Sequence, residues 1–321
     1  MQTKDLVLGI DIGGTNTAFG FVDRQGAVVL SGALPTQPRD SADAFVARLY
    51  DRIEAAKRGL VFPYRLCGIG IGAPNAHHSR GTVENPPNLN WGEKVDFAAL
   101  IRRRCPPPVS ITNDANAAAL GEMLFGGARG MQHFMVLTIG TGLGSGIVVD
   151  GRLVYGASGF AGELGHTVVD PDGRPCSCGK RGCLEAYVSA PGLVKTALDM
   201  LEDQHEASGL RDMSHNEITS QKIFELAGGG DVLALAAFDK TARILGMKLA
   251  DAVAHTSPEV IFLTGGVSRA GDLLLKPAQT YMNTFLFGVY RGTVKLLPSA
   301  LPAGESAILG AAALIWSELT L

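Results

Sequence analysis

The sequence predicts an α/β protein with mixed sheets, arranged as two related lobes. Residues 7–15 and 136–144 each form an apolar run that enters a glycine-rich turn, and two further short apolar runs follow each of them. Helical patterns lie between these runs, as is typical of layered α/β domains. Because any two β-hairpins share part of this pattern, the internal repeat is a hypothesis.

The composition allows a large core and narrows the classes of partner. Apolar residues make up 46 % of the chain, charged residues 18 %, and the net charge is −3. No Lys/Arg-rich run is present, which argues against nucleic acid or an anionic membrane as the main partner. The sequence also lacks a signal-peptide pattern and an apolar stretch of the roughly 18 residues that span a bilayer. We therefore expect a cytoplasmic protein in a reducing compartment, where disulfides are disfavoured.

The individual elements follow from periodicity and capping residues. Residues 41–58 place Phe45, Leu49 and Ile53 four residues apart, which gives one apolar helical face. The other predicted elements are strands within 7–15 and 136–144 and at 19–23, 27–32, 67–72, 109–112, 145–150, 152–156 and 260–264, an alanine-rich helix at 115–125, a long helix at 232–255 with a break near Gly246, and a closing helix at 306–319 capped by Ser306.

Two glycine-rich turns are candidate phosphate-binding loops. Glycines let backbone N–H groups approach an anion, and threonine hydroxyls add donors. Asp11 ends a strand, where its carboxylate can hold Mg²⁺ through water. Neither turn fits the Walker pattern or a dinucleotide fingerprint, and either one alone is compatible with an ordinary hairpin. The residues concerned are Asp11, Gly13, Gly14 and Thr15 in the first turn, and Gly140, Thr141, Gly142 and Gly144 in the second.

Three of the five cysteines lie within eight residues and form a candidate metal site. Cys176, Cys178 and Cys183 follow His166 by ten residues or more. Three thiolates and one imidazole make a closed tetrahedral Zn²⁺ site without an open position for water, so the metal is predicted to be structural. The alternatives are free buried thiols or a disulfide, and both leave the histidine unexplained. The remaining cysteines, at 67 and 105, are interpreted as small apolar side chains.

An Asn-Asp pair marks the start of the alanine-rich helix. Asn113 and Asp114 follow a β-like run, and either side chain can cap the helix. An aspartate at a strand end is also suited to accept a proton from a substrate hydroxyl. The residues themselves leave both readings open.

Four motifs, in this order, resemble the ROK family of repressors, open reading frames and kinases, within the superfamily of actin-like ATPases and sugar kinases. The resemblance covers the chain from Leu8 to the final helix. The motifs are Asp11-x-Gly13-Gly14-Thr15, Asn113-Asp114, Glu163-x-Gly165-His166, and Cys176-x-Cys178-Gly179-x-x-Gly182-Cys183-x-Glu185.

The resemblance implies a two-lobed, actin-like (ribonuclease H-like) sugar kinase fold with an interdomain cleft. The small N-terminal lobe is predicted to comprise residues 1–115 and 306–321, and the large C-terminal lobe, which carries the zinc loop, residues 116–305. The paired glycine turns then bind the phosphates of ATP, and Gly265-Gly266 after the strand at 260–264 resembles the adenosine motif of the superfamily. The alternative is that this glycine pair simply forms a turn between a strand and a helix.

The resemblance also assigns roles to the polar residues. Asp114 corresponds to the general base of sugar kinases, and Asn113 to a sugar ligand. Glu163, His166 and Glu185 correspond to the residues that read the sugar, with zinc making rigid a loop too rich in glycine to hold itself. Either glutamate alone is also compatible with a solvated surface position.

Two further asparagines are candidate sugar contacts. Asn75 ends the segment GAPN, where the family more often has glycine, so the role of this position is in doubt. Asn88 begins an N-L-x-W segment that resembles ROK glucokinases. Either asparagine can instead hold a turn.

The resemblance implies an ATP- and Mg²⁺-dependent kinase of carbohydrate metabolism (glycolysis) that phosphorylates a hexose at O6. Glucose is the expected substrate. A homodimer is the expected assembly. The alternatives are a kinase for N-acetylmannosamine, N-acetylglucosamine, fructose or mannose, because the cysteine loop also resembles N-acylmannosamine kinases. A sugar-responsive repressor is disfavoured because only seven residues precede Leu8, too few for a helix-turn-helix. An actin-like ATPase for protein clients would leave the cysteine cluster unexplained.

Overall fold

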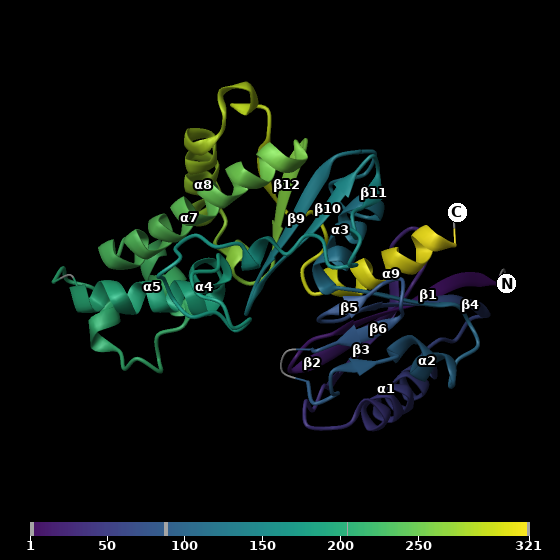
Figure 1. The fold of residues 1–321 in the computed structure, drawn as a ribbon. Helices are drawn as coiled ribbons and strands as arrows, with labels where there is room; N and C mark the ends of the chain where they lie inside the picture. The colour runs from purple at the N-terminus through teal and green to yellow at the C-terminus, as the bar shows by residue number, and fades with distance from the viewer. Residues whose placement is uncertain (1–2, 87–88, 204, 320–321) are drawn as a thin grey trace. The chain divides into compact units, whose positions relative to one another are not determined.

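A computed structural model describes residues 3–86, 89–203 and 205–319, and it confirms an α/β fold with mixed sheets (Figure 1). The chain divides into two compact units. The first unit comprises Met1–Met131, Gly151–Ala161 and Ala300–Leu321, and the second comprises Gln132–Asp150 and Gly162–Ser299. The lobe boundaries given above stay a prediction.

A five-stranded mixed sheet forms the centre of the first unit. Its strands are β1 (Lys4–Ile12), β2 (Asn16–Val22), β3 (Val28–Pro35), β4 (Tyr64–Gly72) and β8 (Val109–Thr112). Their order in the sheet is β3-β2-β1-β4-β8. The hairpins β1-β2 and β2-β3 are antiparallel, whereas β4 and β8 add in parallel. The carboxyl ends of β1, β4 and β8 therefore meet at one edge.

Alternate residues of β1 face two helical layers. Ile10 belongs to a core cluster with α1 (Ala42–Lys57) and α2 (Phe97–Arg102), while Val7 packs with the C-terminal helix α9 (Ser306–Glu318). This alternation is the period of two that a strand buried on both faces requires. The predicted helix at 41–58 is confirmed, and Ser41 caps it by accepting a hydrogen bond from the backbone of Ala44.

The second unit has its own mixed sheet. Its strands are β9 (Phe134–Ile139), β10 (Leu143–Val149), β12 (Val260–Thr264) and β13 (Lys295–Pro298), in the order β10-β9-β12-β13. The pair β9-β10 is antiparallel, and β12 and β13 add in parallel. The first unit has the same arrangement in β2-β1-β4-β8, so the predicted internal repeat is confirmed as a shared topology.

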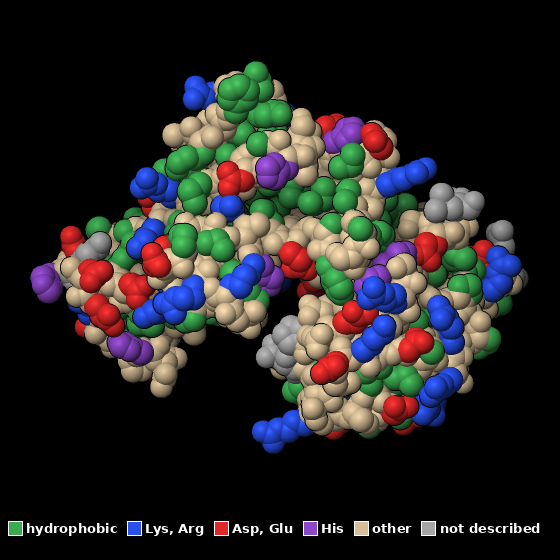
Figure 2. Space-filling model, in the orientation of Figure 1, with side chains coloured by type: hydrophobic (Ala, Val, Ile, Leu, Met, Phe, Trp, Pro, Cys, Tyr) green, Lys and Arg blue, Asp and Glu red, His purple; other side chains and the backbone are tan. Residues whose placement is uncertain are grey.

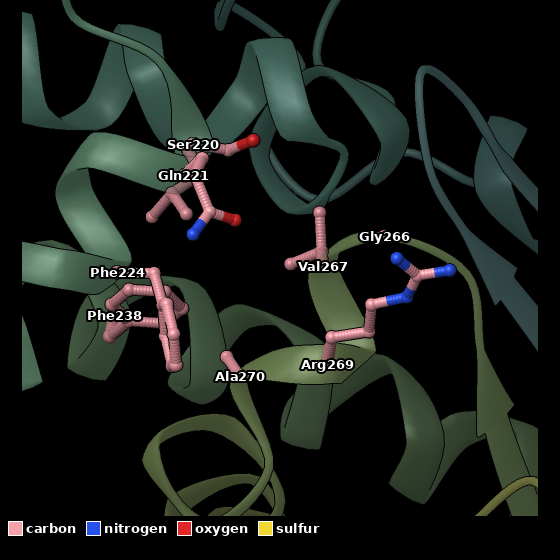
Figure 3. Close-up of a pocket in the computed structure, with 9 residues that line it drawn as sticks. Ser220, Gln221, Phe224, Phe238, Gly266, Val267, Arg269 and Ala270 are labelled. Carbon is pink, nitrogen blue, oxygen red and sulfur yellow. The ribbon is translucent and has the colours of Figure 1, made fainter. Parts of the chain in front are cut away.

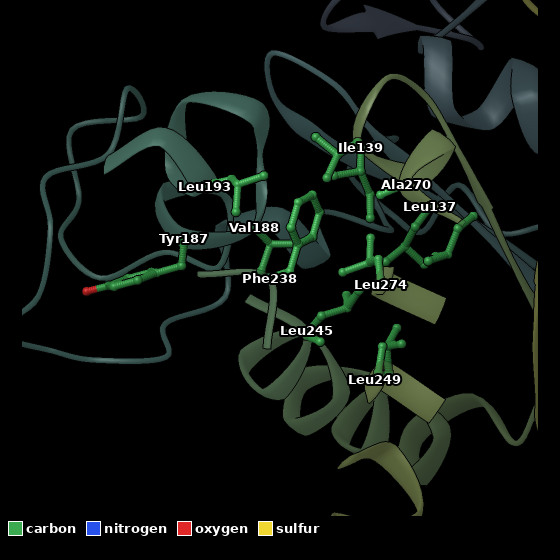
Figure 4. Packing of buried hydrophobic residues seen from close by; sticks show 14 of the residues in the cluster. Leu137, Ile139, Tyr187, Val188, Leu193, Phe238, Leu245, Leu249, Ala270 and Leu274 are labelled. Atoms are coloured by element: carbon green, nitrogen blue, oxygen red, sulfur yellow. The ribbon is translucent and has the colours of Figure 1, made fainter. Parts of the chain in front are cut away.

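Helices cover the sheet of the second unit. They are α4 (Glu185–Val188), α5 (Ala190–Asp203), α6 (Ser220–Gly228), α7 (Val232–Thr256) and α8 (Asp272–Phe285). Leu137 and Ile139 of β9 pack with Leu245 of α7 and Leu274 of α8, and Leu193 of α5 joins the same cluster (Figure 4). The alternation within β9 and the apolar faces of the helices explain this core.

Two details of the helix predictions are wrong. The predicted break near Gly246 does not occur, because α7 runs unbroken. A Cβ atom at Gly246 would lie 2.7 Å from the backbone nitrogen of Met282, so the glycine serves close packing against α8. Ser306 is not the cap of the closing helix but its first residue, and Glu305 is the N-cap position.

Some elements were not predicted from the sequence. A small antiparallel sheet in the first unit consists of β5 (Ala76–His77), β6 (Thr82–Glu84) and β7 (Lys94–Val95). The helices α2, α4, α5, α6 and α8 and the strand β13 were likewise not predicted, whereas the short strand β11 (Arg152–Leu153) lies within the predicted strand at 152–156. Strands of two or three residues carry too little periodicity to be recognised.

The surface is of mixed charge. Figure 2 shows Lys and Arg side chains interspersed with Asp and Glu on the face in view. Within the described parts of the chain, none of the helices combines the length and apolar character needed to cross a bilayer.

Candidate active site and metal centre

The carboxyl edge of the parallel strands in the first unit brings two aspartates together. Asp11 of β1 pairs with Gly72 of β4, which in turn pairs with Thr112 of β8. Asp114 follows Thr112 by two residues and begins helix α3 (Asp114–Leu124). A Cβ atom at Gly72 would lie 3.4 Å from Oδ1 of Asp11 and 3.8 Å from Cα of Asp114. Gly72 therefore leaves room between two carboxylates that are about a hundred residues apart in sequence.

Asn113, and not Asp114, caps this helix. The Oδ1 atom of Asn113 accepts hydrogen bonds from the backbone N–H groups of Ala115 (2.8 Å) and Asn116 (3.1 Å). Asp114 occupies the first helical position, where its Oδ1 atom accepts from Ala115 at 2.8 Å. Capping of the helix therefore does not explain why an aspartate stands at position 114. Because the cap uses the Oδ1 atom of Asn113, the Nδ2 group of that side chain remains to donate a hydrogen bond to a ligand.

Burial raises the pKa of both carboxyl groups. The loss of solvent around Asp11, followed by repulsion from Asp114, raises the pKa of Asp11 to about 7. The same loss of solvent raises the pKa of Asp114, although the N–H of Ala115 works in the opposite direction. Displaced carboxyl pKa values of this kind are characteristic of functional sites.

The first glycine turn is tied back onto the sheet. The N–H of Gly13 donates to the carbonyl of Asn16 at 3.0 Å, and the hydroxyl of Thr36 donates to the carbonyl of Gly13 at 2.7 Å. Thr15 accepts from the backbone of Thr36 at 2.8 Å through its carbonyl, and its side chain is exposed. The turn is thus held through its carbonyl groups.

Asn75 has a backbone conformation that explains its departure from the family pattern. Its φ angle is +51°, in the left-handed region that glycine and asparagine tolerate best. Its Nδ2 group donates to the carbonyl of Asn85 at 2.9 Å. Asn75 therefore replaces a glycine at a position that needs a positive φ, and it holds the loop. The other predicted asparagine, Asn88, lies outside the described residues.

The predicted metal ligands converge in the second unit. One donor atom from each of His166, Cys176, Cys178 and Cys183 lies within 4.8 Å of all the others. The Sγ atoms of Cys178 and Cys183 are 3.7 Å apart, and Sγ of Cys176 lies 3.7 Å from Nδ1 of His166. Tetrahedral zinc with Zn–S bonds of about 2.3 Å separates two sulfurs by about 3.8 Å, whereas a disulfide needs about 2.0 Å. The spacing matches a metal site and not a disulfide.

The burial of one ligand, Cys183, also favours a cation. Cys183 is fully buried, and this burial raises the pKa of its thiol to about 12. A thiolate at this position is therefore costly unless a positive charge compensates it. A bound Zn²⁺ supplies that charge and keeps the thiolates deprotonated.

The backbone of the metal loop, residues 166–185, forms hydrogen bonds within the loop. The N–H of Cys176 donates to the carbonyl of Lys180 at 2.9 Å, and that of Gly182 to Arg174 at 2.7 Å. The backbone of this loop therefore pairs with itself, and the expectation that zinc makes the loop rigid stays a prediction.

Arg174, which the sequence did not single out, anchors the metal loop. Its guanidinium group donates to the carbonyls of Ala186 (3.1 Å) and Gly192 (3.0 Å) and to the carboxylate of Asp199 (2.7 Å). The guanidinium also lies over the ring of Tyr187, 4.6 Å from its centroid. Only the position of Arg174 beside the cysteine motif could have drawn attention to it.

The two predicted sugar-binding glutamates flank the metal ligands at different depths. Glu163 is exposed and precedes the 3₁₀ helix η1 (Leu164–His166). Glu185 is half-buried at the start of α4, where its Oε1 atom accepts from the hydroxyl of Ser177 at 3.1 Å. Its Oε2 atom accepts from the backbone N–H of Leu143 at 2.9 Å. Glu185 therefore contacts both the metal loop and the second glycine turn.

The second glycine turn joins β9 and β10. The N–H of Gly140 donates to the carbonyl of Gly142 at 2.9 Å, which closes the turn, and Thr141 at its tip is exposed. Gly144, at half-buried depth, pairs with Thr138 across the hairpin. The turn is therefore a tight connection at the end of the sheet.

Gly265 lies next to this turn, and the adjacent Gly266 borders a pocket. Gly265 has a φ of +97°, and a Cβ atom there would lie 2.5 Å from the carbonyl oxygen of Ile139, the last residue of β9. Gly266 lines a pocket with residues of η3 (Val267–Ala270) and of α5, α6 and α7 (Figure 3). Its walls are partly apolar and partly polar, formed by Leu193, Ser220, Gln221, Phe224, Phe238, Val267, Arg269 and Ala270.

Comparisons with known proteins agree on one family. A sequence model described as "ROK family" matches residues 7–318. The glucokinase of Halalkalibacterium halodurans is 34 % identical over 282 residues, which cover 87 % of this chain and 85 % of that protein. A xylose repressor from Caldicellulosiruptor bescii is 30 % identical over 98 % of this chain and 78 % of the repressor.

A solved structure agrees in fold. The ROK family glucokinase from Streptomyces griseus, in complex with glucose and AMPPNP, superimposes with a TM-score of 0.82 at 36 % identity, covering 96 % of this chain and 98 % of that one. With the family model spanning nearly the whole sequence, the chain belongs to the ROK family.

Proposed function

We propose that this chain is an ATP-dependent kinase that phosphorylates glucose at O6. The observation that carries the proposal is the placement of Asp114 beside Asp11 at the carboxyl edge of β1, β4 and β8. This edge is where open α/β sheets bind ligands. The similarity to a glucokinase with bound glucose and AMPPNP supports the choice of reaction.

Asp114 is the general base of the proposed reaction. The O6 hydroxyl of the sugar attacks the γ-phosphorus of ATP, the bond to the β-γ bridging oxygen breaks, and ADP leaves. The hydroxyl proton passes to the carboxylate of Asp114. Its raised pKa suits this role, because a general base works best when its pKa approaches the working pH.

The two glycine turns bind the phosphates of ATP, and Asp11 would hold Mg²⁺. The backbone N–H groups of Gly14 and Thr15 and of Thr141 and Gly142 provide donors for phosphate oxygens, because those of Gly13, Gly140 and Leu143 already donate within the protein. Asp11, held near neutrality by its surroundings, gains a favourable partner when a cation arrives. When bound, Mg²⁺ neutralises charge on the β- and γ-phosphates.

The sugar is read by oxygen and nitrogen atoms of polar side chains. Glu163, Glu185 and His166 accept or orient its hydroxyls, and Asn113 adds a donor through Nδ2. Asn75 and Asn88 complete the set. A pair of carboxylates suits a free 2-hydroxyl, which donates one hydrogen bond.

The nucleoside occupies the pocket beside Gly265 and Gly266. The apolar side chains of Phe224, Phe238 and Val267 suit one face of a base, and the flat backbone at the glycines allows close contact.

The four ligands of the metal centre would hold zinc in a closed, structural site, because no position remains for a reacting water.

Initial rates with ATP and a panel of sugars test the function. We expect ADP release with glucose, and the panel includes mannose, fructose, N-acetylglucosamine and N-acetylmannosamine. A preference for an N-acyl sugar would overturn the choice of glucose. Sugar binding without ADP release from any sugar would instead favour a sugar-responsive regulator, the function of the xylose repressors to which the chain is similar.

The assembly is proposed to be a homodimer. The second unit exposes apolar side chains at Phe287 (71 % exposed) and Val289 (67 %), a kind of surface that oligomers often bury. Sedimentation velocity at several concentrations decides it, and a monomer at all concentrations would contradict the proposal.

A further inference from the structure

The carboxylate of Glu185 connects two functional segments of the second unit. Its Oε1 atom faces the metal loop, 3.1 Å from the hydroxyl of Ser177 and 3.8 Å from Sγ of Cys176. Its Oε2 atom accepts the N–H of Leu143 at 2.9 Å. Leu143 directly follows the glycine turn, so one side chain contacts both the proposed sugar-reading loop and the proposed phosphate-binding turn.

The turn is shaped to admit this carboxylate. A Cβ atom at Gly142 would lie 2.7 Å from Oε2 of Glu185, closer than such atoms approach. At Gly140, two residues earlier in the same turn, an added Cβ would meet no atom within 4 Å. Neither glycine has a positive φ. The close approach of Glu185 therefore requires glycine at position 142. At position 140, neither a contact with Glu185 nor backbone strain requires glycine.

We propose that Glu185 is a positioning residue for the phosphate-binding turn and that it belongs to the sugar and nucleotide sites at once. This inference rests on the proposed function. A sugar hydroxyl that binds Glu185 fixes the carboxylate that holds the N–H of Leu143, and the turn is then ordered before ATP arrives. By thermodynamic reciprocity, a nucleotide that orders the turn favours the sugar.

A matched pair of glycine substitutions tests the inference by calorimetry with glucose alone. In Gly142→Ala the new methyl group displaces the end of a flexible side chain, so the fold is retained and the carboxylate moves. We expect glucose affinity to fall about fivefold or more, close to the loss of one ordinary hydrogen bond. In Gly140→Ala we expect glucose affinity to stay within twofold of the wild type, whatever happens to ATP. Glucose affinity within twofold of the wild type in Gly142→Ala would overturn the inference.

The reciprocal pair is measured with AMPPNP and no sugar. We expect Glu185→Ala to weaken AMPPNP binding about fivefold or more, and Glu163→Ala, which changes the other proposed sugar carboxylate, to leave it within twofold. Zinc content, measured on each variant, shows that the metal centre is intact. Unchanged AMPPNP affinity in Glu185→Ala would equally overturn the inference. A wild-type protein that binds no glucose would contradict the proposed function itself.

Discussion

Asn113 caps helix α3, so a substitution of Asp114 tests its proposed role as the general base without removing the cap. Asp114→Asn keeps the shape of the side chain but removes its ability to accept a proton. We expect kcat to fall by about 10² or more, the usual contribution of a general base, while glucose still binds. Asp43→Asn is the matched control, because Asp43 is also an acidic residue in the first turn of a helix, α1. Coupled assays of both variants decide it, and turnover of Asp114→Asn within tenfold of the wild type would contradict the assignment.

Asp11 predicts a pH dependence of stability. Its pKa is raised to about 7 in the folded protein from an ordinary value of 3.8, so the folded state binds the proton more tightly than the unfolded state. Stability from this group is complete below about pH 4 and is lost as the pH rises towards 7. Without Mg²⁺ and nucleotide, the wild type should lose about 2 °C or more in Tm relative to Asp11→Asn between pH 5 and pH 8. Parallel pH profiles of Tm for the two proteins would contradict the raised pKa.

The metal loop shows how a local motif becomes a structural element. Its four candidate ligands and its backbone pairing all lie within twenty residues. Bound zinc would compensate the charge of a thiolate at the buried Cys183. We expect about one zinc per chain, lost in Cys178→Ser and retained in Cys67→Ser, whose sulfur lies outside the cluster. Elemental analysis of freshly purified protein gives the answer, and wild-type protein without stoichiometric zinc would exclude the site.

Arg174 holds the metal loop against α4 and α5 through a mostly buried guanidinium group. Arg174→Met removes its hydrogen bonds and leaves the carbonyls of Ala186 and Gly192 without this donor, so we expect a loss of about 2 kcal/mol or more in the free energy of unfolding. Lys195→Met is the control, because Lys195 pairs with the same carboxylate, Asp199, but is 53 % exposed. Its loss should be about 0.5 kcal/mol or less. Equal losses in chemical denaturation would show that Arg174 is not a special anchor.

The substrate specificity of the whole protein is tested by comparing glucose with an N-acyl sugar. The two carboxylates proposed to read the sugar, Glu163 and Glu185, suit a free 2-hydroxyl, whereas an acetamido group in its place needs more volume and a partner for its carbonyl oxygen. We expect kcat/KM for glucose to exceed that for N-acetylmannosamine by about tenfold or more, the effect of leaving one buried polar group unpaired. Side-by-side ADP-release assays measure this ratio. Equal values would remove the basis for glucose and leave the fold and the metal centre unaffected.

The sequence by itself determined the features whose parts are close along the chain. The helix at 41–58, the two glycine turns and the Cys₃His cluster all depend on contacts within about twenty residues, so residue types and spacing suffice to predict them. The order of strands and turns also predicted the repeat, because each hairpin is local.

The tertiary structure decided the features that depend on register and packing between distant segments. Asp11 meets Asp114 only because β1, β4 and β8 align Gly72 between them. Glu185 reaches Leu143 across 42 residues. Gly246 was misread as a helix break because a single sequence does not show which neighbour, here α8, comes close. The physical reason is that long-range register follows from the burial of whole sheet and helix faces, which no short segment of sequence contains.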